Sequence, residues 1–340
     1  MKQILILGGG TGGLVAANEL RKQLNKENKI ILIDKNNKHV YAPSFLWLMI
    51  GKRNIKKIQK PLDLLKRKGI DFVNEEIIKI DPKKKIVKTT KNKFDYDYLI
   101  ISLGAELAPE KVDGLSEGGY NLYQLEDVER LRNDLKGFHG GKVCIVISSL
   151  PFKCPAAPYE AAFLLDEYLY KKGIRNRTEI DIFTPEMLPM PSAGPENGKI
   201  IKSMLESRNI TFNPEVQLTS VNSNKKEIRF KENKIVNYDI LIFVPPNQSP
   251  KVIKDSGIGN ETGWIPVDKN TLKTKYENIF AIGDVASITL DSGKPLPKAG
   301  VFAHFEAEIV TENIVAEING LIPRKKYDGH AYCFLELGYG

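Results

Sequence analysis

Short, almost wholly apolar runs alternate along this chain with stretches of helical periodicity. The run 4–7 (ILIL) is followed by the glycine-rich loop 8–13, a stretch 14–24 with apolar residues at helical spacing, and a second apolar run, 29–34 (KIILID). Strands without polar alternation are typical of a parallel sheet that is buried on both faces. The pattern therefore predicts the strand, loop, helix and strand of an α/β domain.

The same order of elements returns further along the chain. The run 142–148 (KVCIVIS) predicts a strand, a helix is expected to start near Cys154, and 179–185 (EIDIFTP) predicts the next strand. The run 238–250 (YDILIFVPPNQSP) resembles 96–105 (YDYLIISLGA) in pattern and in its place within its unit. This echo predicts two copies of one nucleotide-binding architecture.

Other segments complete the expected elements. A strand pair is predicted from 72–81 and 85–90, around the turn PKKK, and a helix from 125–135. Near the end, 277–286 (ENIFAIGDVA) predicts a further strand, and 298–318 predicts a long helix.

Composition narrows the function classes. The 340 residues carry a formal charge of +8, with lysine concentrated in 52–60 and 83–93; we interpret these runs as solvated faces, with an anionic membrane surface as the alternative. No basic groove with stacking aromatics indicates a nucleic-acid partner. The sequence shows no signal-peptide pattern and no apolar run long enough to span a membrane. We therefore expect a cytoplasmic protein and leave peripheral membrane contact open.

A dinucleotide-binding fingerprint opens the chain. Gly8, Gly10 and Gly13 form G-x-G-x-x-G between a predicted strand and a predicted helix, and Asp34 ends the next strand. Such glycines permit a tight turn, close approach of the backbone to a pyrophosphate and close packing of helix on strand, while the acid accepts hydrogen bonds from a ribose. The alternative, a purely structural glycine turn, does not explain the acid.

The segment 277–286 favours FAD over NAD at this site. Asp284 follows a buried strand beside Gly283, the position used to bind a ribityl chain in two-domain flavoproteins. The helix that starts near Lys298 would direct its positive end and an ammonium group toward the pyrimidine side of a flavin. Otherwise Asp284 is a turn or N-cap residue and Lys298 a surface charge.

These motifs carry a family resemblance. The segments GGGTGG, LIISLGA and IFAIGDVA, in this order, resemble the glutathione-reductase-like flavoproteins, which bind FAD on one domain and NAD(P)H on a second. The segments FKCPAAPYE, PSAGPENGK and DGHAYCFLELG resemble more narrowly the sulfide:quinone oxidoreductases and the flavoprotein subunit of flavocytochrome c sulfide dehydrogenase. The cysteine-bearing segments are far more specific than the first group.

The fold and the cofactor site follow from the fingerprint and the resemblance together. We expect an α/β protein with two Rossmann-like domains: a discontinuous FAD-binding domain (1–108 and 246–320), a second domain (109–245) that carries a redox cysteine, and a C-terminal cysteine segment (321–340). FAD contacts are assigned to Gly8, Gly10, Thr11, Gly12, Gly13, Asp34, Lys35, Ile77, Gly104, Gly283, Asp284, Lys298 and Ala299.

The second unit lacks what a nicotinamide dinucleotide needs. The loop SSLPFKCP contains no glycine, and EIDIFTP ends without an evident acid for a ribose or basic residue for a 2'-phosphate. Cys154 lies there instead, just before Pro155, which suits a first helical position. A sulfur near a helix N-terminus is favoured as thiolate by about 0.3–1 kcal/mol. We therefore interpret Cys154 as a reactive thiol; the alternative is a small buried hydrophobe.

The resemblance assigns the second redox cysteine. A cysteine at the point that matches Cys333 approaches the flavin in the resembled family and forms a disulfide or sulfur bridge with the partner that Cys154 matches. Cys144, inside a predicted strand, is expected to be a buried core thiol. Some family members have a third cysteine upstream of the second strand unit, whereas 105–143 contains none.

The resemblance therefore implies FAD-dependent oxidation of sulfide to polysulfide or sulfur through Cys154 and Cys333, with a quinone as acceptor. Two alternatives stay open: an NADH:quinone oxidoreductase on the same fold, and an electron-transfer flavoprotein subunit of a larger complex. Membrane-bound relatives continue past the CFLELG region into amphipathic helices of the quinone site, whereas this sequence ends at Gly340. We expect no metal, and self-association is left open. Glu160 is either a proton acceptor near Cys154 or a solvated carboxylate.

Overall fold

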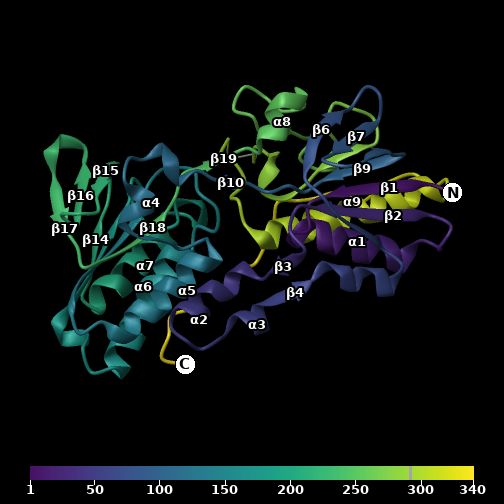
Figure 1. Ribbon diagram of the computed structural model, residues 1–340. Coiled ribbons are helices and arrows are strands. Elements are labelled where there is room, and N and C mark those ends of the chain that lie inside the picture. Colours follow the sequence, from purple (N-terminus) through teal and green to yellow (C-terminus); the bar gives the residue numbers. More distant parts are fainter. Residues whose placement is uncertain (291–292) are drawn as a thin grey trace. The chain divides into compact units, whose positions relative to one another are not determined.

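The structure is a computed structural model that describes residues 1–290 and 293–340 (Figure 1). The chain forms two compact units. Unit 1 consists of Met1–Val40, Gln59–Glu106 and Gln248–Cys333, and unit 2 consists of Tyr41–Ile58, Leu107–Asn247 and Phe334–Gly340. The functional domain boundaries inferred from the sequence are a different division and stay a prediction.

Unit 1 is built on a five-stranded parallel sheet. Its strand order is β21-β9-β1-β2-β5, with β1 paired to both β2 and β9. The apolar runs of the sequence form these strands, and Ile4 to Leu7 of β1 are fully buried. The bounds are β1 Gln3–Leu7, β2 Lys29–Asp34, β5 Asp71–Asn74, β9 Tyr98–Ile101 and β21 Ile279–Ala281.

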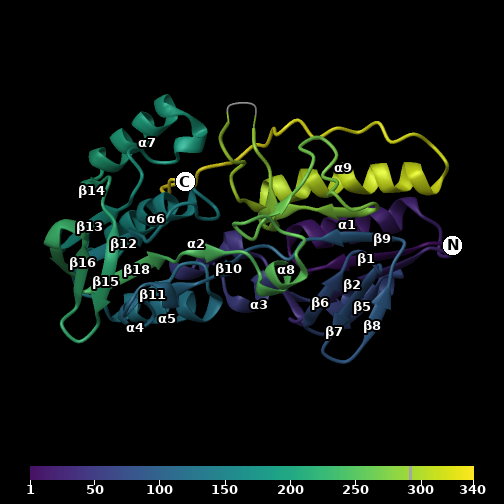
Figure 2. The ribbon, with the colours of Figure 1, turned by 90° about the horizontal axis from the view of Figure 1, so that it is seen from above.

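Two helices and a small antiparallel sheet cover the sheet of unit 1. Helices α1 (Thr11–Gln23) and α9 (Gly300–Ile318) pack against each other on one face, and β6, β7 and β8 lie on the other (Figure 2). The antiparallel strands are Ile77–Asp81, Ile86–Thr89 and Lys93–Asp95. The run 72–81 thus holds two strands, because β5 ends at Asn74 and only β6 pairs with β7.

Unit 2 contains a second five-stranded parallel sheet, in the order β11-β18-β12-β13-β14. Helix α6 (Ala157–Lys171) packs on β12 and β13. The three-stranded meander β15-β16-β17 packs against the sheet through Leu218, Val221, Ile228 and Phe230. The sheet strands are β11 Tyr120–Asn121, β12 Gly141–Ile147, β13 Thr178–Phe183, β14 Ile210–Asn213 and β18 Ile240–Val244.

Four neighbouring strands have the same order in the two sheets, and the fifth differs: β21 is the last of its sheet along the chain, and β11 is the first of its sheet. The corresponding strands are β9, β1, β2 and β5 in unit 1 and β18, β12, β13 and β14 in unit 2. In both units the next strands along the chain, after β5 and after β14, form a three-stranded antiparallel sheet. The predicted duplication is therefore confirmed, and the fold is two Rossmann-like units of one architecture. The loops after β1 and after β12 occupy corresponding places.

Other elements complete the two units. In unit 1 they are β3 Lys38–Val40, β4 Gln59–Pro61, α8 Lys251–Ser256, β20 Ile265–Pro266 and β22 Ala286–Ser287. In unit 2 they are α2 Phe45–Met49, α3 Ile55–Ile58, α4 Leu115–Gly118, α5 Leu125–Gly137, α7 Pro195–Ser207, β15 Leu218–Asn222, β16 Glu227–Phe230 and β17 Ile235–Asn237. The chain crosses between units at β10 Glu106–Leu107 and β19 Asn247–Gln248.

Candidate active site

The glycine loop after β1 has no room for side chains at two of its positions. Gly8 has φ +103°, and a Cβ there would lie 2.3 Å from the carbonyl oxygen of Ser102. A Cβ on Gly13 would lie 1.9 Å from the carbonyl oxygen of Gly8. By contrast, a Cβ on Gly10 would meet nothing within 4 Å. The loop is therefore tightly packed behind and open in front, which fits a pyrophosphate cradle.

The N-termini of α1 and α9 meet beside this loop. Gly10 is the N-cap of α1 and provides no side-chain cap, so amide groups of the first turn remain available to an anion. A Cβ on Gly300, the first residue of α9, would lie 3.3 Å from Oγ1 of Thr11. A Cβ on Gly12 would lie 3.4 Å from the carbonyl oxygen of Ala303 in α9. Two positive helix ends thus face one locality, which suits a diphosphate.

Asp34 joins the second strand to the loop. Its Oδ2 accepts the N–H of Gly9 at 2.6 Å, and its Oδ1 accepts the N–H of Asn36 at 2.7 Å. His39 Nδ1 lies 2.9 Å from the carbonyl oxygen of Gly9. Because a carbonyl only accepts, Nδ1 carries the proton in this bond. Both sides of the Gly9 peptide are therefore held, while the neighbouring Lys35 is exposed.

A second polar cluster surrounds Gly283, which has φ +71°. Its N–H donates to Oε2 of Glu306, a carboxyl that is 1% exposed and whose pKa burial raises to about 7. Lys298 Nζ donates to the carbonyl oxygen of Asp284 and lies 3.6 Å from the ring centre of Trp264. Burial lowers the pKa of Lys298 to about 8, against the opposing charges of Asp284 and Glu306. Lys298 is half-buried, so the interpretation as a surface charge is wrong.

The remaining assigned residues of unit 1 lie at strand and helix ends. Ala299 is the N-cap of α9, Gly104 follows β9 with φ +68°, and Ile77 is a buried residue at the start of β6. A Cβ on Gly104 would meet nothing within 4 Å, so its backbone borders open space. Their contact with a cofactor stays a prediction.

In unit 2, the loop after β12 has a different construction. It runs from Ser148 to Ala156, and Ser148 donates through its hydroxyl to the carbonyl oxygen of Val244 at 2.6 Å. Phe152 is buried, and Cys154 is half-buried with φ +52°. A non-glycine residue in the left-handed region is uncommon and is concentrated at functional sites.

The start of α6 corrects one expectation. The helix begins at Ala157, with Ala156 as N-cap and Pro158 in its first turn. Pro155 lies in the preceding turn, which the N–H of Ala157 closes by donating to the carbonyl oxygen of Cys154 at 3.0 Å. Cys154 thus precedes the helix by one turn, because its left-handed backbone cannot continue into α-helix.

Buried carboxyls surround this loop. Glu160 is 8% exposed, so the solvated alternative is wrong; burial raises its pKa, and Oε1 accepts the N–H of Glu336 at 2.9 Å. Glu186, three residues after β13, is 3% exposed, and burial raises its pKa to about 7. Its Oε2 accepts hydrogen bonds from the hydroxyls of Tyr159 and Thr184. These bonds occupy the acid that follows the second strand of unit 2.

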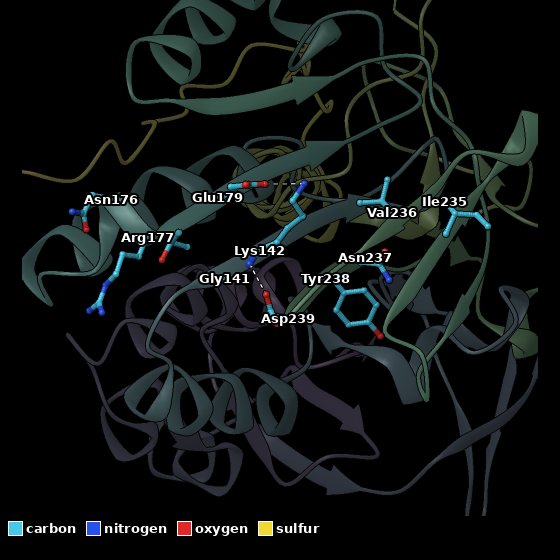
Figure 3. Close-up of a pocket in the computed structure, with 11 residues that line it drawn as sticks. Gly141, Lys142, Asn176, Arg177, Glu179, Ile235, Val236, Asn237, Tyr238 and Asp239 are labelled. Atoms are coloured by element: carbon cyan, nitrogen blue, oxygen red, sulfur yellow. Dashed lines mark hydrogen bonds and ion pairs between the residues drawn. The ribbon is translucent and has the colours of Figure 1, made fainter.

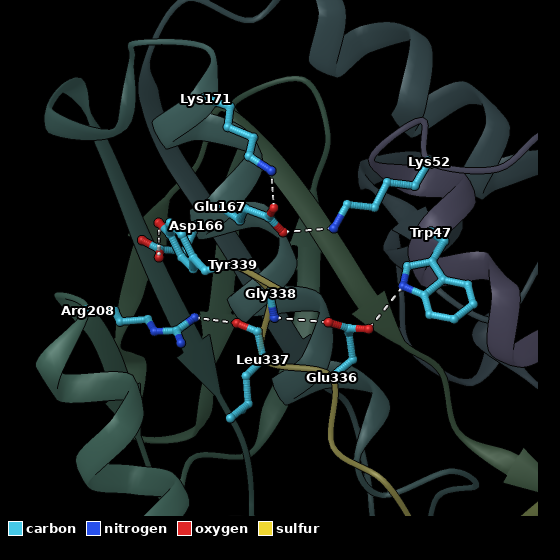
Figure 4. A network of polar contacts seen from close by, with 10 residues as sticks. All are labelled: Trp47, Lys52, Asp166, Glu167, Lys171, Arg208, Glu336, Leu337, Gly338 and Tyr339. Carbon is cyan, nitrogen blue, oxygen red and sulfur yellow. Dashed lines mark hydrogen bonds and ion pairs between the residues drawn. The ribbon is translucent and has the colours of Figure 1, made fainter.

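The C-terminal tail 334–340 follows Cys333, an exposed thiol, and binds α6 and its neighbours in unit 2. Tyr339 donates through its hydroxyl to Asp166 at 2.9 Å, and Arg208 donates to the carbonyl oxygen of Leu337 (Figure 4). Trp47 Nε1 donates to Glu336 at 3.3 Å (Figure 4). No helix or strand forms within 321–340, the segment that the family resemblance assigns to the second redox cysteine.

The acid at the centre of this network is Glu167, which is 1% exposed. It pairs with Lys52 at 3.0 Å and with Lys171, and these ammonium groups hold its pKa near 2 although burial opposes this (Figure 4). The apolar run 41–51 leads into the same network and packs through α2 on α5 and α6. Phe45, Leu46, Leu48 and Met49 of this run are buried, so its apolar residues belong to the core of unit 2.

An open cavity of about 750 Å³ lies at the opposite end of the parallel strands of unit 2, where β12 and β13 begin. Lys142 pairs there with Glu179 at 2.9 Å, and its backbone N–H donates to Asp239 at 2.7 Å (Figure 3). Ligands of such sheets bind beyond the carboxyl ends of the strands. This cavity is therefore not the candidate site.

Metal sites and membrane-spanning helices were the two remaining questions about the described residues. Within 1–290 and 293–340, no group of three or more His, Cys, Asp or Glu side chains is placed to hold a metal ion. Over the same residues, none of the helices combines the length and the apolar character that a bilayer crossing requires.

Comparison with known proteins identifies the family. The model of the pyridine nucleotide-disulphide oxidoreductase family matches residues 2–307. The chain belongs to this family. A sulfide:quinone oxidoreductase from mitochondria of Dictyostelium discoideum is 30% identical over 99% of the chain and 75% of that protein, which places the chain among the sulfide:quinone oxidoreductase relatives. It is an oxidoreductase, and its cofactor is FAD.

The chain is also similar to two quinone-linked oxidoreductases with different electron donors in their names. The solved sulfide:quinone oxidoreductase of Aquifex aeolicus is 26% identical, with a TM-score of 0.84 over 94% of this chain and 78% of that one. The type II NADH:quinone oxidoreductase of Staphylococcus aureus is also 26% identical, over 94% of this chain and 83% of that protein.

The flavoprotein fold places residues near the candidate sites that the sequence did not indicate. Glu306 lies on the buried side of α9, and Glu186 and Tyr159 face each other behind the Cys154 loop. Glu306 could have been found because it is a charged residue inside an apolar helical stretch. Glu186 could have been found because it is an acid that follows a predicted strand. For Tyr123, whose hydroxyl bonds to the carbonyl of Cys154, the sequence carries no signal.

Proposed function

We propose that this flavoprotein oxidises sulfide to polysulfide or sulfur through Cys154 and Cys333, and that the electrons pass through FAD to a quinone. The relatives named sulfide:quinone oxidoreductase in Dictyostelium discoideum and Mus musculus, and the sulfide-quinone reductase of Aquifex aeolicus, support these two substrates. Cytoplasmic location, peripheral membrane contact and self-association stay predictions.

The observation that carries the proposal is the loop after β12. In unit 1 the corresponding loop presents glycines and open space before Gly10, whereas in unit 2 the chain presents Cys154 in a left-handed conformation. The acid after β13 is also occupied, because Glu186 accepts hydrogen bonds from Tyr159 and Thr184. A nicotinamide dinucleotide thus lacks both its phosphate cradle and its ribose acceptor in unit 2.

The arrangement of the tail supports Cys333 as the partner. Cys333 precedes Glu336 by three residues, a chain length that spans about 10 Å at most. Glu336 donates its N–H to Glu160, which lies in the first turn of α6, the helix that follows the Cys154 loop. The tail that follows Cys333 in the chain is therefore bound to the helix that follows the Cys154 loop.

The proposed reaction balances in sulfur and electrons. Hydrosulfide attacks a Cys154–Cys333 disulfide, so that one sulfur–sulfur bond breaks and another forms, with a persulfide on Cys333 and a thiolate on Cys154. Loss of two electrons and the persulfide proton then joins the two cysteines through one additional sulfur. Bound FAD would supply the two-electron acceptor for this step and the reductant for the quinone. Further cycles lengthen the sulfur chain until polysulfide leaves.

Unit 1 supplies the residues expected to hold FAD. The amides of the loop and of the first turn of α1 face the diphosphate, Asp34 accepts from the ribose, and Lys298 places a positive charge near Asp284. The buried fit of Gly8 and Gly13 and the open space before Gly10 agree with this assignment. The complete set of FAD contacts remains part of the proposal.

The test is an anaerobic flavin spectrum on addition of sulfide and then of quinone. In the wild-type holoenzyme, sulfide bleaches the flavin and quinone restores it. Cys154→Ser and Cys333→Ser should retain FAD but lose at least about 100-fold in bleaching rate, because removal of a nucleophile typically costs that much or more. Cys144→Ala is the matched control, since Cys144 is fully buried in the sheet and burial raises its pKa to about 12.

Bleaching that survives in Cys154→Ser would overturn the cysteine mechanism. Stoichiometric bleaching by NADH but not by sulfide would instead select an NADH:quinone oxidoreductase, as in the Staphylococcus aureus relative. Bleaching by sulfide without reoxidation by quinone, in a preparation that copurifies with a cytochrome, would select an electron-transfer subunit.

A further inference from the structure

The backbone of Cys154 is held in its left-handed conformation by hydrogen bonds to its carbonyl oxygen. One comes from the N–H of Ala157 at 3.0 Å and closes the local turn before α6. The other comes from the hydroxyl of Tyr123 at 3.2 Å, across a separation of 31 residues. Because a non-glycine residue with φ near +52° is strained, it persists only where the surrounding structure holds it.

Tyr123 is itself fixed at the edge of the sheet of unit 2. It follows β11, whose neighbour Leu122 donates its N–H to the carbonyl oxygen of Phe243 in β18 at 3.0 Å. The N–H of Tyr123 donates to Oδ1 of Asn121 at 3.0 Å, and Asn121 is 1% exposed. The hydroxyl is thus presented to the Cys154 loop from a rigid base.

Two further observations join Tyr123 to this loop. The ammonium group of Lys153 lies 5.9 Å from the centre of the Tyr123 ring. Burial, followed by the charges of Cys154, Glu160 and Glu186, raises the pKa of Tyr123 well above its usual value. The hydroxyl therefore keeps its proton and acts as a permanent donor to the carbonyl of Cys154.

We propose that Tyr123 is a positioning residue for the redox thiol: its hydroxyl holds Cys154 in the conformation from which the sulfur reacts. This inference rests on the proposed role of Cys154 in sulfide oxidation. Without the hydroxyl, the carbonyl loses one of the hydrogen bonds that hold it, and the backbone relaxes toward an ordinary conformation. Such a relaxation changes the direction of the Cα–Cβ bond and thus moves the sulfur.

The chain offers a matched pair of variants. Tyr123→Phe removes only the hydroxyl. Tyr168→Phe removes a hydroxyl from another half-buried tyrosine of unit 2, which donates to the backbone carbonyl of Leu135 at 3.3 Å. Each variant therefore loses one hydrogen bond to a backbone carbonyl, and the two bonds have similar lengths. Only the bond of Tyr123 involves Cys154.

We expect Tyr123→Phe to lower the limiting rate of anaerobic flavin bleaching by sulfide about three- to tenfold, the range that loss of one hydrogen bond gives. The sulfide concentration at half-maximal rate should stay unchanged, because only the fraction of correctly placed thiol falls. The rate of alkylation of reduced Cys154 by iodoacetamide, followed by peptide mass spectrometry, should change by a similar factor. Tyr168→Phe should leave both rates unchanged at an equal loss of unfolding free energy.

The inference is overturned if Tyr123→Phe bleaches and alkylates at wild-type rates, or if Tyr168→Phe changes both rates as much. If sulfide does not bleach the wild-type flavin at all, the proposed function fails, and the alkylation rates alone decide on Tyr123. If Tyr123→Phe fails to fold, Tyr123→Trp tests the same point, since its ring fills the site and its N–H cannot occupy the position of the hydroxyl; a wild-type alkylation rate there contradicts the proposal.

Discussion

The loops after β1 and after β12 occupy equivalent places in two sheets that share the order of four strands, yet they have opposite construction. The loop in unit 1 is short and glycine-rich, and its function is in its backbone, which packs at Gly8 and Gly13 and stays open at Gly10. The loop in unit 2 is longer, has no glycine, and has a left-handed Cys154. One architecture can therefore present either backbone amide groups or a cysteine side chain at the same place, and under the proposed function these serve a phosphate and a redox centre.

The acid at the end of β2 and the acid after β13 also differ, in their exposure and in their hydrogen-bond partners. Asp34 is part-exposed and accepts backbone N–H groups, so it retains acceptor capacity for a ribose. Glu186 is buried and accepts side-chain hydroxyls of Tyr159 and Thr184. In the second unit this acid holds Tyr159 of α6, the helix that begins directly after the Cys154 loop.

The largest effect is expected from a substitution in the glycine loop of unit 1, which should lower both stability and FAD binding. Gly13→Ala places a methyl group 1.9 Å from a backbone oxygen that cannot move aside, so the apoprotein should lose about 3 kcal/mol of unfolding free energy and retain no FAD. Gly10→Ala should fold normally and bind FAD weakly, because its methyl group enters only the open space. Chemical denaturation of the apoprotein and FAD titration separate the two. Equal stability of both variants would contradict the packing argument.

An intermediate effect concerns Glu186. Burial raises its pKa to about 7 from the ordinary 4.5, so the folded state holds the proton more tightly than the unfolded state. Its stabilising contribution is complete below pH of about 4.5 and is lost as pH rises through about 7, up to about 3 kcal/mol. Urea unfolding between pH 4.5 and 8 should show that Glu186→Gln loses this share of the pH dependence, while the share of Glu306, whose pKa burial also raises to about 7, remains. Glu196→Gln, at an exposed position of α7, is the control and should leave the dependence as it is.

The smallest effect is expected on FAD affinity, from substitutions of His39, which contacts the carbonyl of Gly9. An asparagine amide can replace the Nδ1–H group that faces the carbonyl of Gly9, whereas a glutamine amide replaces Nε2. His39→Gln should therefore weaken FAD binding to the apoprotein by about two- to tenfold, the value of one hydrogen bond, and His39→Asn should not. Fluorescence titration measures both constants. Equal weakening in the two variants would show that the ring, and not this bond, matters.

Much of this picture was predictable from local pattern. The apolar runs gave the strands β1, β2, β12 and β13, since residues buried on both faces leave an unbroken apolar signal. The duplication followed from the resemblance between 96–105 and 238–250, which became β9 and β18 in equivalent places. The helix start after Cys154 was placed too early, because a left-handed cysteine leaves no mark in the sequence.

The sequence by itself determined the two Rossmann-like units, the glycine loop from Gly8 to Gly13 and the glycine-free loop with Cys154, because each depends on residue types at short spacing. Only the tertiary structure decided that Glu186 supports α6, that Glu306 holds the N–H of Gly283, and that Tyr123 reaches the carbonyl of Cys154. These contacts join residues far apart in the chain. Burial and hydrogen-bond partners at such distances arise from packing, which no local pattern of residues encodes.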